Sequence, residues 1–95
     1  YQAGLAVTTG MNNTIVGTNA GDAITTGNSN ILMGRNAGGA INVGSNNICF
    51  GDSAGDAITD GTYNVAIGGN GAGGAIIGGD GNVAIGGSAL EQNRL

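Results

Sequence analysis

The stretch Asn47-Ile48-Cys49-Phe50-Gly51 decides the fold of this chain, because its pattern of asparagine, three mostly apolar residues and glycine occurs five times. The five asparagines follow one another at steps of 17, 17, 17 and 18 residues. They are Asn13, Asn30, Asn47, Asn64 and Asn82. A fixed period of about 17 residues is too short for the common helical repeats and indicates a solenoid in which each period forms one coil.

A second motif repeats with the same period. It reads Ala20-Gly21-Asp22-Ala23-Ile24-Thr25 in its clearest copy. We therefore expect two short strands in each coil, and the fold class is all-β: a parallel β-solenoid, or β-roll, over residues 1–87. Residues 88–95 are expected to form a C-terminal tail, in which Ser88-Ala89-Leu90-Glu91 fits a capping box and allows the start of a helix or neck.

Side chains alternate across a strand, so each Asn-x-x-x-Gly segment has two apolar faces. We expect the larger pair, such as Ile48 and Phe50, to fill the coil together with the isoleucines of the second motif. The middle residue of each segment then lies on the outside of the coil. We expect two further copies of the chain, around a threefold axis, to bury these residues. The expected trimer interface is Ile15, Leu32, Cys49, Ala66 and Ala84.

The second motif is apolar on one face only. Its isoleucines are expected inside, and their polar neighbours outside, where they could face a receptor. These neighbours are Thr8, Thr25, Asn42 and Thr59.

The recurring asparagines should stack about 4.8 Å apart at one corner and hydrogen-bond along the stack. We expect this ladder to be structural. Arg35 aligns with Asp52 of the next coil, which predicts an exposed ion pair of small energetic value. Cys49 is expected to be a small core hydrophobe and not a reactive thiol.

The composition excludes several classes of function. The chain has 95 residues, 22 of them glycine, a net charge of −4, two Lys or Arg, and no histidine or proline. So few cations cannot neutralise a nucleic-acid backbone. No apolar run approaches the roughly 20 residues of a membrane helix, so membrane insertion is not expected. Because the chain starts at Tyr1 and not at methionine, we expect it to be a piece of a longer protein.

No catalytic, metal or cofactor site is expected, and we interpret the chain as a non-enzyme. Without histidine there is no Ser-His or Cys-His nucleophile system. Asp22 and Asp56 lie two coils apart, which is better explained by avoidance of a like-charge ladder than by a hydrolytic pair. The segment 78–82 has a faint likeness to calcium-binding β-rolls, but it occurs once, and such sites need neighbouring coils to share ligands.

The segments Asn64-Val65-Ala66-Ile67-Gly68 and Asn82-Val83-Ala84-Ile85-Gly86 resemble the N-S-V-A-I-G element of trimeric autotransporter adhesin heads. The longer period resembles repeats of bacteriophage tail-fibre proteins. Two features differ: the period exceeds that of the adhesin heads, and the Ser of their element is absent, since Tyr63 and not Ser precedes Asn64. The resemblance implies a homotrimeric, extracellular or virion-borne fibre that takes part in host or surface attachment, with a glycan or protein receptor.

A second hypothesis stays open at this point. The threonine column also suits a monomeric β-solenoid that binds ice or glycan. Ice binding requires a flat and regular threonine face, and Asn42, Asp60 and Ile77 interrupt this one.

Overall fold

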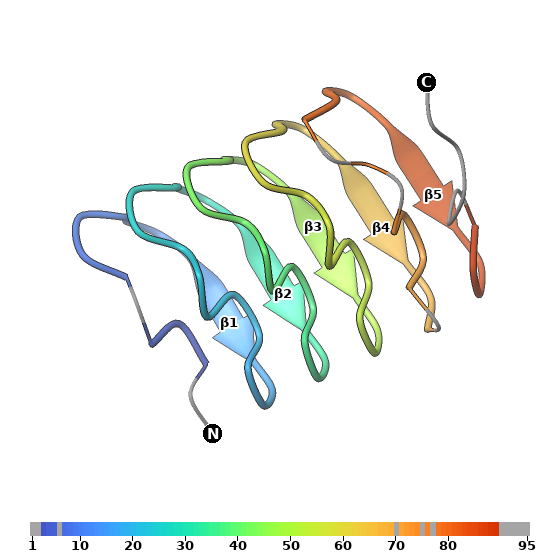
Figure 1. Ribbon diagram of the computed structural model, residues 1–95, viewed down its shortest axis with the longest axis horizontal. Coiled ribbons are helices and arrows are strands. Elements are labelled where there is room, and N and C mark those ends of the chain that lie inside the picture. The colour runs from blue at the N-terminus through green and yellow to red at the C-terminus, as the bar shows by residue number, and fades with distance from the viewer. Residues whose placement is uncertain (1–2, 6, 70, 75, 77, 90–95) are drawn as a thin grey trace.

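A computed structural model of the chain describes residues 3–5, 7–69, 71–74, 76 and 78–89. These residues form an all-β solenoid with a single parallel sheet (Figure 1). Each strand comes from one Asn-x-x-x-Gly segment. The strands are β1 (Thr14–Val16), β2 (Ile31–Met33), β3 (Ile48–Phe50), β4 (Val65–Ile67) and β5 (Val83–Ile85).

The sheet has the strand order β1-β2-β3-β4-β5, and its register follows the sequence repeat. Cys49, for example, pairs with Leu32 on one side and with Ala66 on the other. Equivalent residues of successive coils therefore lie directly above one another. The predicted solenoid and its period of 17 residues are confirmed.

The second motif does not form a strand in the described residues, contrary to our expectation. It runs as turns and bends, although backbone hydrogen bonds still link it along the stack, as from Thr25 N–H to the Asn42 carbonyl and from Asn42 N–H to the Thr59 carbonyl. The glycines that flank this motif keep the extended stretch too short for a strand.

The core occupies the inside of the coil, between the strands and the second motif. Ile24, Ile41 and Ile58 are fully buried there, as predicted, and the alanines Ala20, Ala37, Ala54 and Ala72 fill the narrow corner. The isoleucines pack against the middle residues of the strands, which come from the opposite wall.

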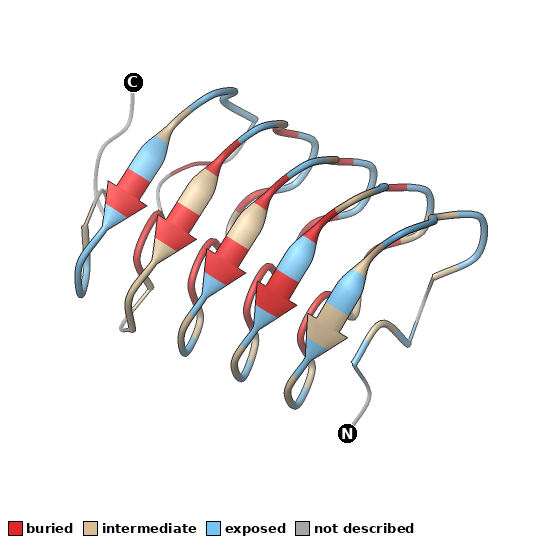
Figure 2. Ribbon diagram, turned by 180° about the vertical axis from the view of Figure 1, so that it is seen from behind, coloured by how far each residue is buried: buried red, intermediate tan, exposed pale blue. Residues whose placement is uncertain are grey.

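The predicted assignment of the two strand faces is wrong. Leu32, Cys49, Ala66 and Ala84 are buried inside their own chain, and Ile15 is half-buried against the same core (Figure 2). The residues on either side of them face outward. Ile15, Leu32, Cys49, Ala66 and Ala84 therefore cannot be the surface that a second copy covers.

The reason for the reversal lies in the asparagine that precedes each strand. Asn30, Asn47 and Asn64 are fully buried. Because side chains alternate along extended backbone, the residue two positions after a buried asparagine also points inward. That residue is the middle one of the strand, so its two neighbours point outward.

Glycines set the spacing between coils. Gly51 has φ +125, and a Cβ on it would lie 2.5 Å from the Gly68 carbonyl oxygen of the next coil. Gly17, Gly34 and Gly68 have the same conformation and the same close approach. Any side chain at this corner would push neighbouring coils apart.

The C-terminal tail begins later than predicted in the described residues. Ser88 and Ala89 occupy the turn positions of Ser53 and Ala54, and the Ala89 carbonyl accepts a hydrogen bond from Gly73 N–H. Ser88 has φ +61, which is not the conformation of a helix N-cap. The remainder of the predicted helix or neck, residues 90–95, lies outside the described residues.

We predict that Gly51→Ala lowers the free energy of unfolding by about 2 kcal/mol or more, because it combines a left-handed backbone with a clash against a main-chain oxygen. Gly87→Ala is the matched control, since a Cβ there would lie 3.8 Å from the Gly69 carbonyl oxygen, which is an ordinary contact distance. Thermal unfolding followed by circular dichroism measures both. Equal melting temperatures for the two variants would contradict the packing described here.

Candidate functional site

The outward side of the sheet carries an unusual apolar surface. It consists of the first and third residues of each strand, and we call it the outer stripe. Nine of its ten side chains are apolar. The outer stripe is Thr14, Val16, Ile31, Met33, Ile48, Phe50, Val65, Ile67, Val83 and Ile85.

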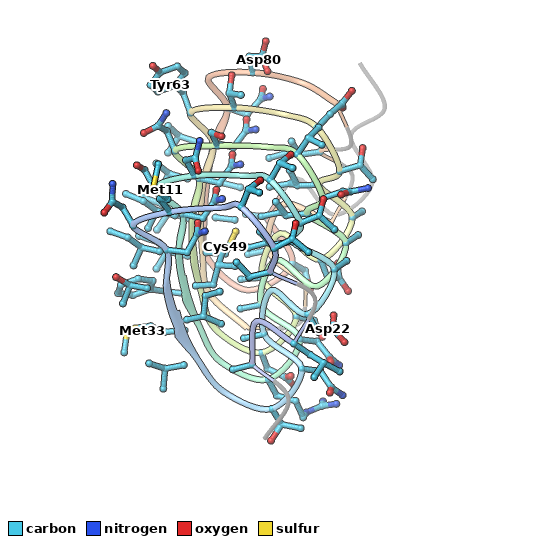
Figure 3. All side chains as sticks on the ribbon, turned by 90° about the vertical axis from the view of Figure 1, so that its left-hand side faces the viewer. Met11, Asp22, Met33, Cys49, Tyr63 and Asp80 are labelled. Atoms are coloured by element: carbon cyan, nitrogen blue, oxygen red, sulfur yellow. The ribbon has the colours of Figure 1, made fainter. Side chains whose placement is uncertain are left out.

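Much of the outer stripe is open to solvent in the single chain. The exposed fraction is 53% for Val16, 41% for Met33, 38% for Phe50 and 65% for Ile85. Figure 3 shows Met33 projecting away from the coil, whereas Cys49 points into it. A contiguous apolar surface of this kind typically marks an interaction site.

Polar residues border the outer stripe on both sides. Before the strands lie turn residues such as Asn28, Ser45 and Asn46. After them lie Arg35 and Asp52, which form the predicted ion pair at 2.9 Å between Nη2 and Oδ2. The two side chains are 62% and 50% exposed, so the pair adds little stability. An apolar centre with a polar rim is the usual anatomy of a protein–protein interface.

The predicted asparagine ladder is present and lies inside the coil. The Asn47 side-chain amide donates to Asn30 Oδ1 at 3.2 Å and to the Gly61 carbonyl at 2.8 Å. Asn47 Oδ1 in turn accepts a hydrogen bond from Asn64 N–H at 3.0 Å. The same pattern links Asn13 with Asn30 and Asn64 with Asn82. The side chains of Asn30 and Asn47 thus each satisfy two main-chain groups of the next coil and bond the asparagine side chain of the previous coil, and the ladder is structural.

The predicted receptor-facing residues lie on the outside, across the interior from the strands. Thr8, Asn42 and Thr59 are exposed and Thr25 is half-buried. The Thr8 hydroxyl donates to the Thr25 carbonyl, and the Thr25 hydroxyl donates to Asn42 Oδ1. The Thr59 hydroxyl donates to Asp60 Oδ1 at 3.3 Å. All three threonine hydroxyls of this set are therefore already used within the chain.

Cys49 has the properties of a core residue. Burial, with a smaller contribution from the Asp56 charge, raises the pKa of its thiol to about 12. The thiol is thus neutral and shielded at physiological pH, and a nucleophilic role is disfavoured.

Other site chemistry is sparse in the part of the chain that the structure describes. There, no group of three or more His, Cys, Asp or Glu side chains is arranged to hold a metal ion. Nor do these residues include a helix of the length and apolarity that crossing a membrane requires. The segment 78–82 forms a turn in which Asp80 Oδ1 accepts hydrogen bonds from the Thr62 N–H and hydroxyl.

Comparison of the chain with protein-family models, curated proteins and solved structures found no match. The class that the structure itself defines is a parallel β-solenoid with an apolar outer stripe. Sequence reasoning missed the outer stripe as a surface. The sequence signal for this surface was the asparagine two positions before the middle residue of each strand. When that asparagine is buried, the middle residue also points inward and its two neighbours point outward.

We predict that Asn47→Ala destabilises the chain by about 2–4 kcal/mol, because it leaves buried main-chain groups such as Asn64 N–H without a partner. Asn42→Thr serves as the control: it restores the threonine of the flanking coils at an exposed position and should change stability by less than about 0.5 kcal/mol. Urea unfolding measures both. A small effect of Asn47→Ala would contradict the role of the ladder.

We also predict that stability falls between pH 9 and pH 12. The pKa of the Cys49 thiol is near its ordinary value of 9.0 in the unfolded chain, whereas burial raises it to about 12 in the folded chain. The folded state therefore binds more protons in this window, and its stability decreases as pH rises. Cys49→Ala, which reproduces the residue of β4 and β5, should lose less stability over the same range. Parallel pH profiles for the two proteins would show that the thiol is not shielded.

Proposed function

We propose that the chain is a structural and adhesive segment of a homotrimeric fibre, extracellular or on a virion, which takes part in host or surface attachment. The outer stripe is the observation that carries this proposal. A single chain leaves Val16, Met33, Phe50 and Ile85 partly in water, and burial of each such side chain is worth about 1–3 kcal/mol. Identical copies of the chain supply matching apolar surfaces.

The shape of the outer stripe favours three copies. It is two side chains wide, with one column formed by the first residue of each strand and the other by the third. Around a threefold axis, the first column of one copy faces one neighbour and the second column faces the other neighbour. Every copy then uses the same surface in the same direction, as cyclic symmetry requires.

The interior of the chain also supports assembly. Its middle column shrinks from Leu32 to Ala66 and Ala84, so the later coils bury less apolar surface than the earlier ones. Small scaffolds without disulfides or metals usually need a further source of stability, and oligomerisation is one. The single cysteine is free and buried, so it does not supply a cross-link.

A solenoid suits an attachment fibre mechanically, since every additional coil extends it by about 4.8 Å. In the proposed trimer, the outer stripes face the axis and the column of Thr8, Thr25, Asn42 and Thr59 stays outside for a glycan or protein receptor. The resemblance to adhesin heads and tail-fibre repeats supports the same location. The proposed role is not enzymatic and requires no cofactor.

The alternative is a monomeric solenoid that binds ice or glycan. The hydrogen bonds that occupy the Thr8 and Thr25 hydroxyls disfavour a regular ice-binding face. Molar mass in solution separates the two functions, and a thermal hysteresis assay tests the alternative directly.

The proposal predicts that Phe50→Glu dissociates the trimer into folded single chains, because it places an unpaired charge at the centre of the apolar surface. Val43→Glu is the matched control. Val43 is 51% exposed but lies in the second motif, away from the outer stripe. Sedimentation velocity should give three times the 9.0 kDa chain mass for the wild type and for Val43→Glu, and one chain mass for Phe50→Glu. A monomeric wild type would reject the fibre proposal.

A further inference from the structure

One turn residue departs from the pattern of the repeat. Tyr63 occupies a corner with φ 57, a left-handed conformation that the equivalent residues Asn12, Ser29, Asn46 and Gly81 also adopt. Asparagine, serine and glycine tolerate this conformation better than a bulky aromatic residue does. The Tyr63 side chain is nevertheless 67% exposed, so contacts within its own chain do not explain its presence.

Tyr63 lies on the rim of the outer stripe. It immediately precedes Asn64 and β4, and Figure 3 shows it projecting outward on the same side of the coil as Met11 and Met33. Its ring therefore extends from the edge at which the strands begin.

On the opposite rim of the outer stripe, the same coil carries a glycine, which has no side chain. The residue after the corner glycine is Thr18, Arg35 or Asp52 in the first three coils, but Gly69 in the fourth. A Cβ at Gly69 would meet nothing within 4 Å. The edge at which β4 ends thus presents an open glycine surface where earlier coils carry a side chain.

We propose that Tyr63 of one copy packs on Gly69 of the neighbouring copy and fixes the register of the assembly. This inference rests on the proposed trimer. Cyclic symmetry brings the edge at which strands begin in one copy against the edge at which they end in the next, with equal coils at equal heights. In the fourth coil, this places the largest rim residue opposite the smallest.

The other coils are complementary in the same arrangement. At equal heights, Ser29 faces Arg35 and Asn46 faces Asp52, so hydrogen-bonding groups face charged groups. In the fifth coil, Gly81 faces Gly87 and no side chain enters the contact. An antiparallel pair of copies would instead bring the edges at which the strands begin against each other, so that Tyr63 would face Ser29 of the second coil and not a glycine surface.

The first test fills the glycine surface. Gly69→Leu should weaken trimer formation at least tenfold, because the new side chain takes the space of the tyrosine ring. Gly87→Leu is the matched control: a Cβ there lies 3.8 Å from the Gly69 carbonyl oxygen, and the facing residue is Gly81. Sedimentation equilibrium should show no change in assembly for Gly87→Leu. Equal effects of the two substitutions would overturn the proposal.

The second test measures proximity directly. The double variant Tyr63→Cys with Gly69→Cys, treated with a short bismaleimide, should give covalent trimers on a denaturing gel, whereas each single variant should remain monomeric. The buried thiol of Cys49 stays unmodified in the folded protein. A trimeric mass without cross-linking would overturn the Tyr63 contact and leave the fibre proposal intact, whereas a monomeric mass would overturn both.

Discussion

Asn30, Asn47 and Asn64 each form hydrogen bonds to the coil before and to the coil after, through the side-chain amide and the main-chain N–H, and the rest of the structure depends on this buried column. These hydrogen bonds keep the asparagine corners of successive coils directly above one another, with the side-chain amides pointing into the coil. Glycines such as Gly34 and Gly51 then allow the next coil to approach closely. The asparagine hydrogen bonds and the close glycine contacts together determine the parallel register of the strands. A different register would break both sets of contacts.

The asparagine column also decides which side chains the protein shows to its surroundings. An inward asparagine puts the middle residue of the strand inside and its two neighbours outside. The interior therefore receives Leu32, Cys49 and Ala66, and the exterior receives larger residues such as Met33 and Phe50. In the proposed fibre, partner chains cover these bulkier apolar side chains. This is the physical link between the fold and the proposed fibre.

The sequence was sufficient to predict the solenoid, its period, the asparagine ladder, the isoleucine column and the Arg35–Asp52 ion pair, because each follows from the alignment of equivalent positions. It misled the assignment of faces, since volume favoured Ile48 and Phe50 for the interior, whereas hydrogen bonding placed Asn47 there. The second motif could not be predicted as turns, because the periodicity of Ala57-Ile58-Thr59 does not show how far flanking glycines shorten a strand. The proposed contact of Tyr63 could not be predicted, because it depends on which rims of neighbouring copies face each other.

The central claim is that sister chains cover the outer stripe, and selective oxidation tests it most directly. Met33 is 41% exposed in a single chain, so dilute hydrogen peroxide would oxidise it if the chain were alone. Mass spectrometry should show Met33 protected in the native wild type and converted to its sulfoxide in the dissociated Phe50→Glu variant. Oxidation of Met33 at the same rate in both proteins, with both folds intact by circular dichroism, would show that the outer stripe faces water and would contradict the account.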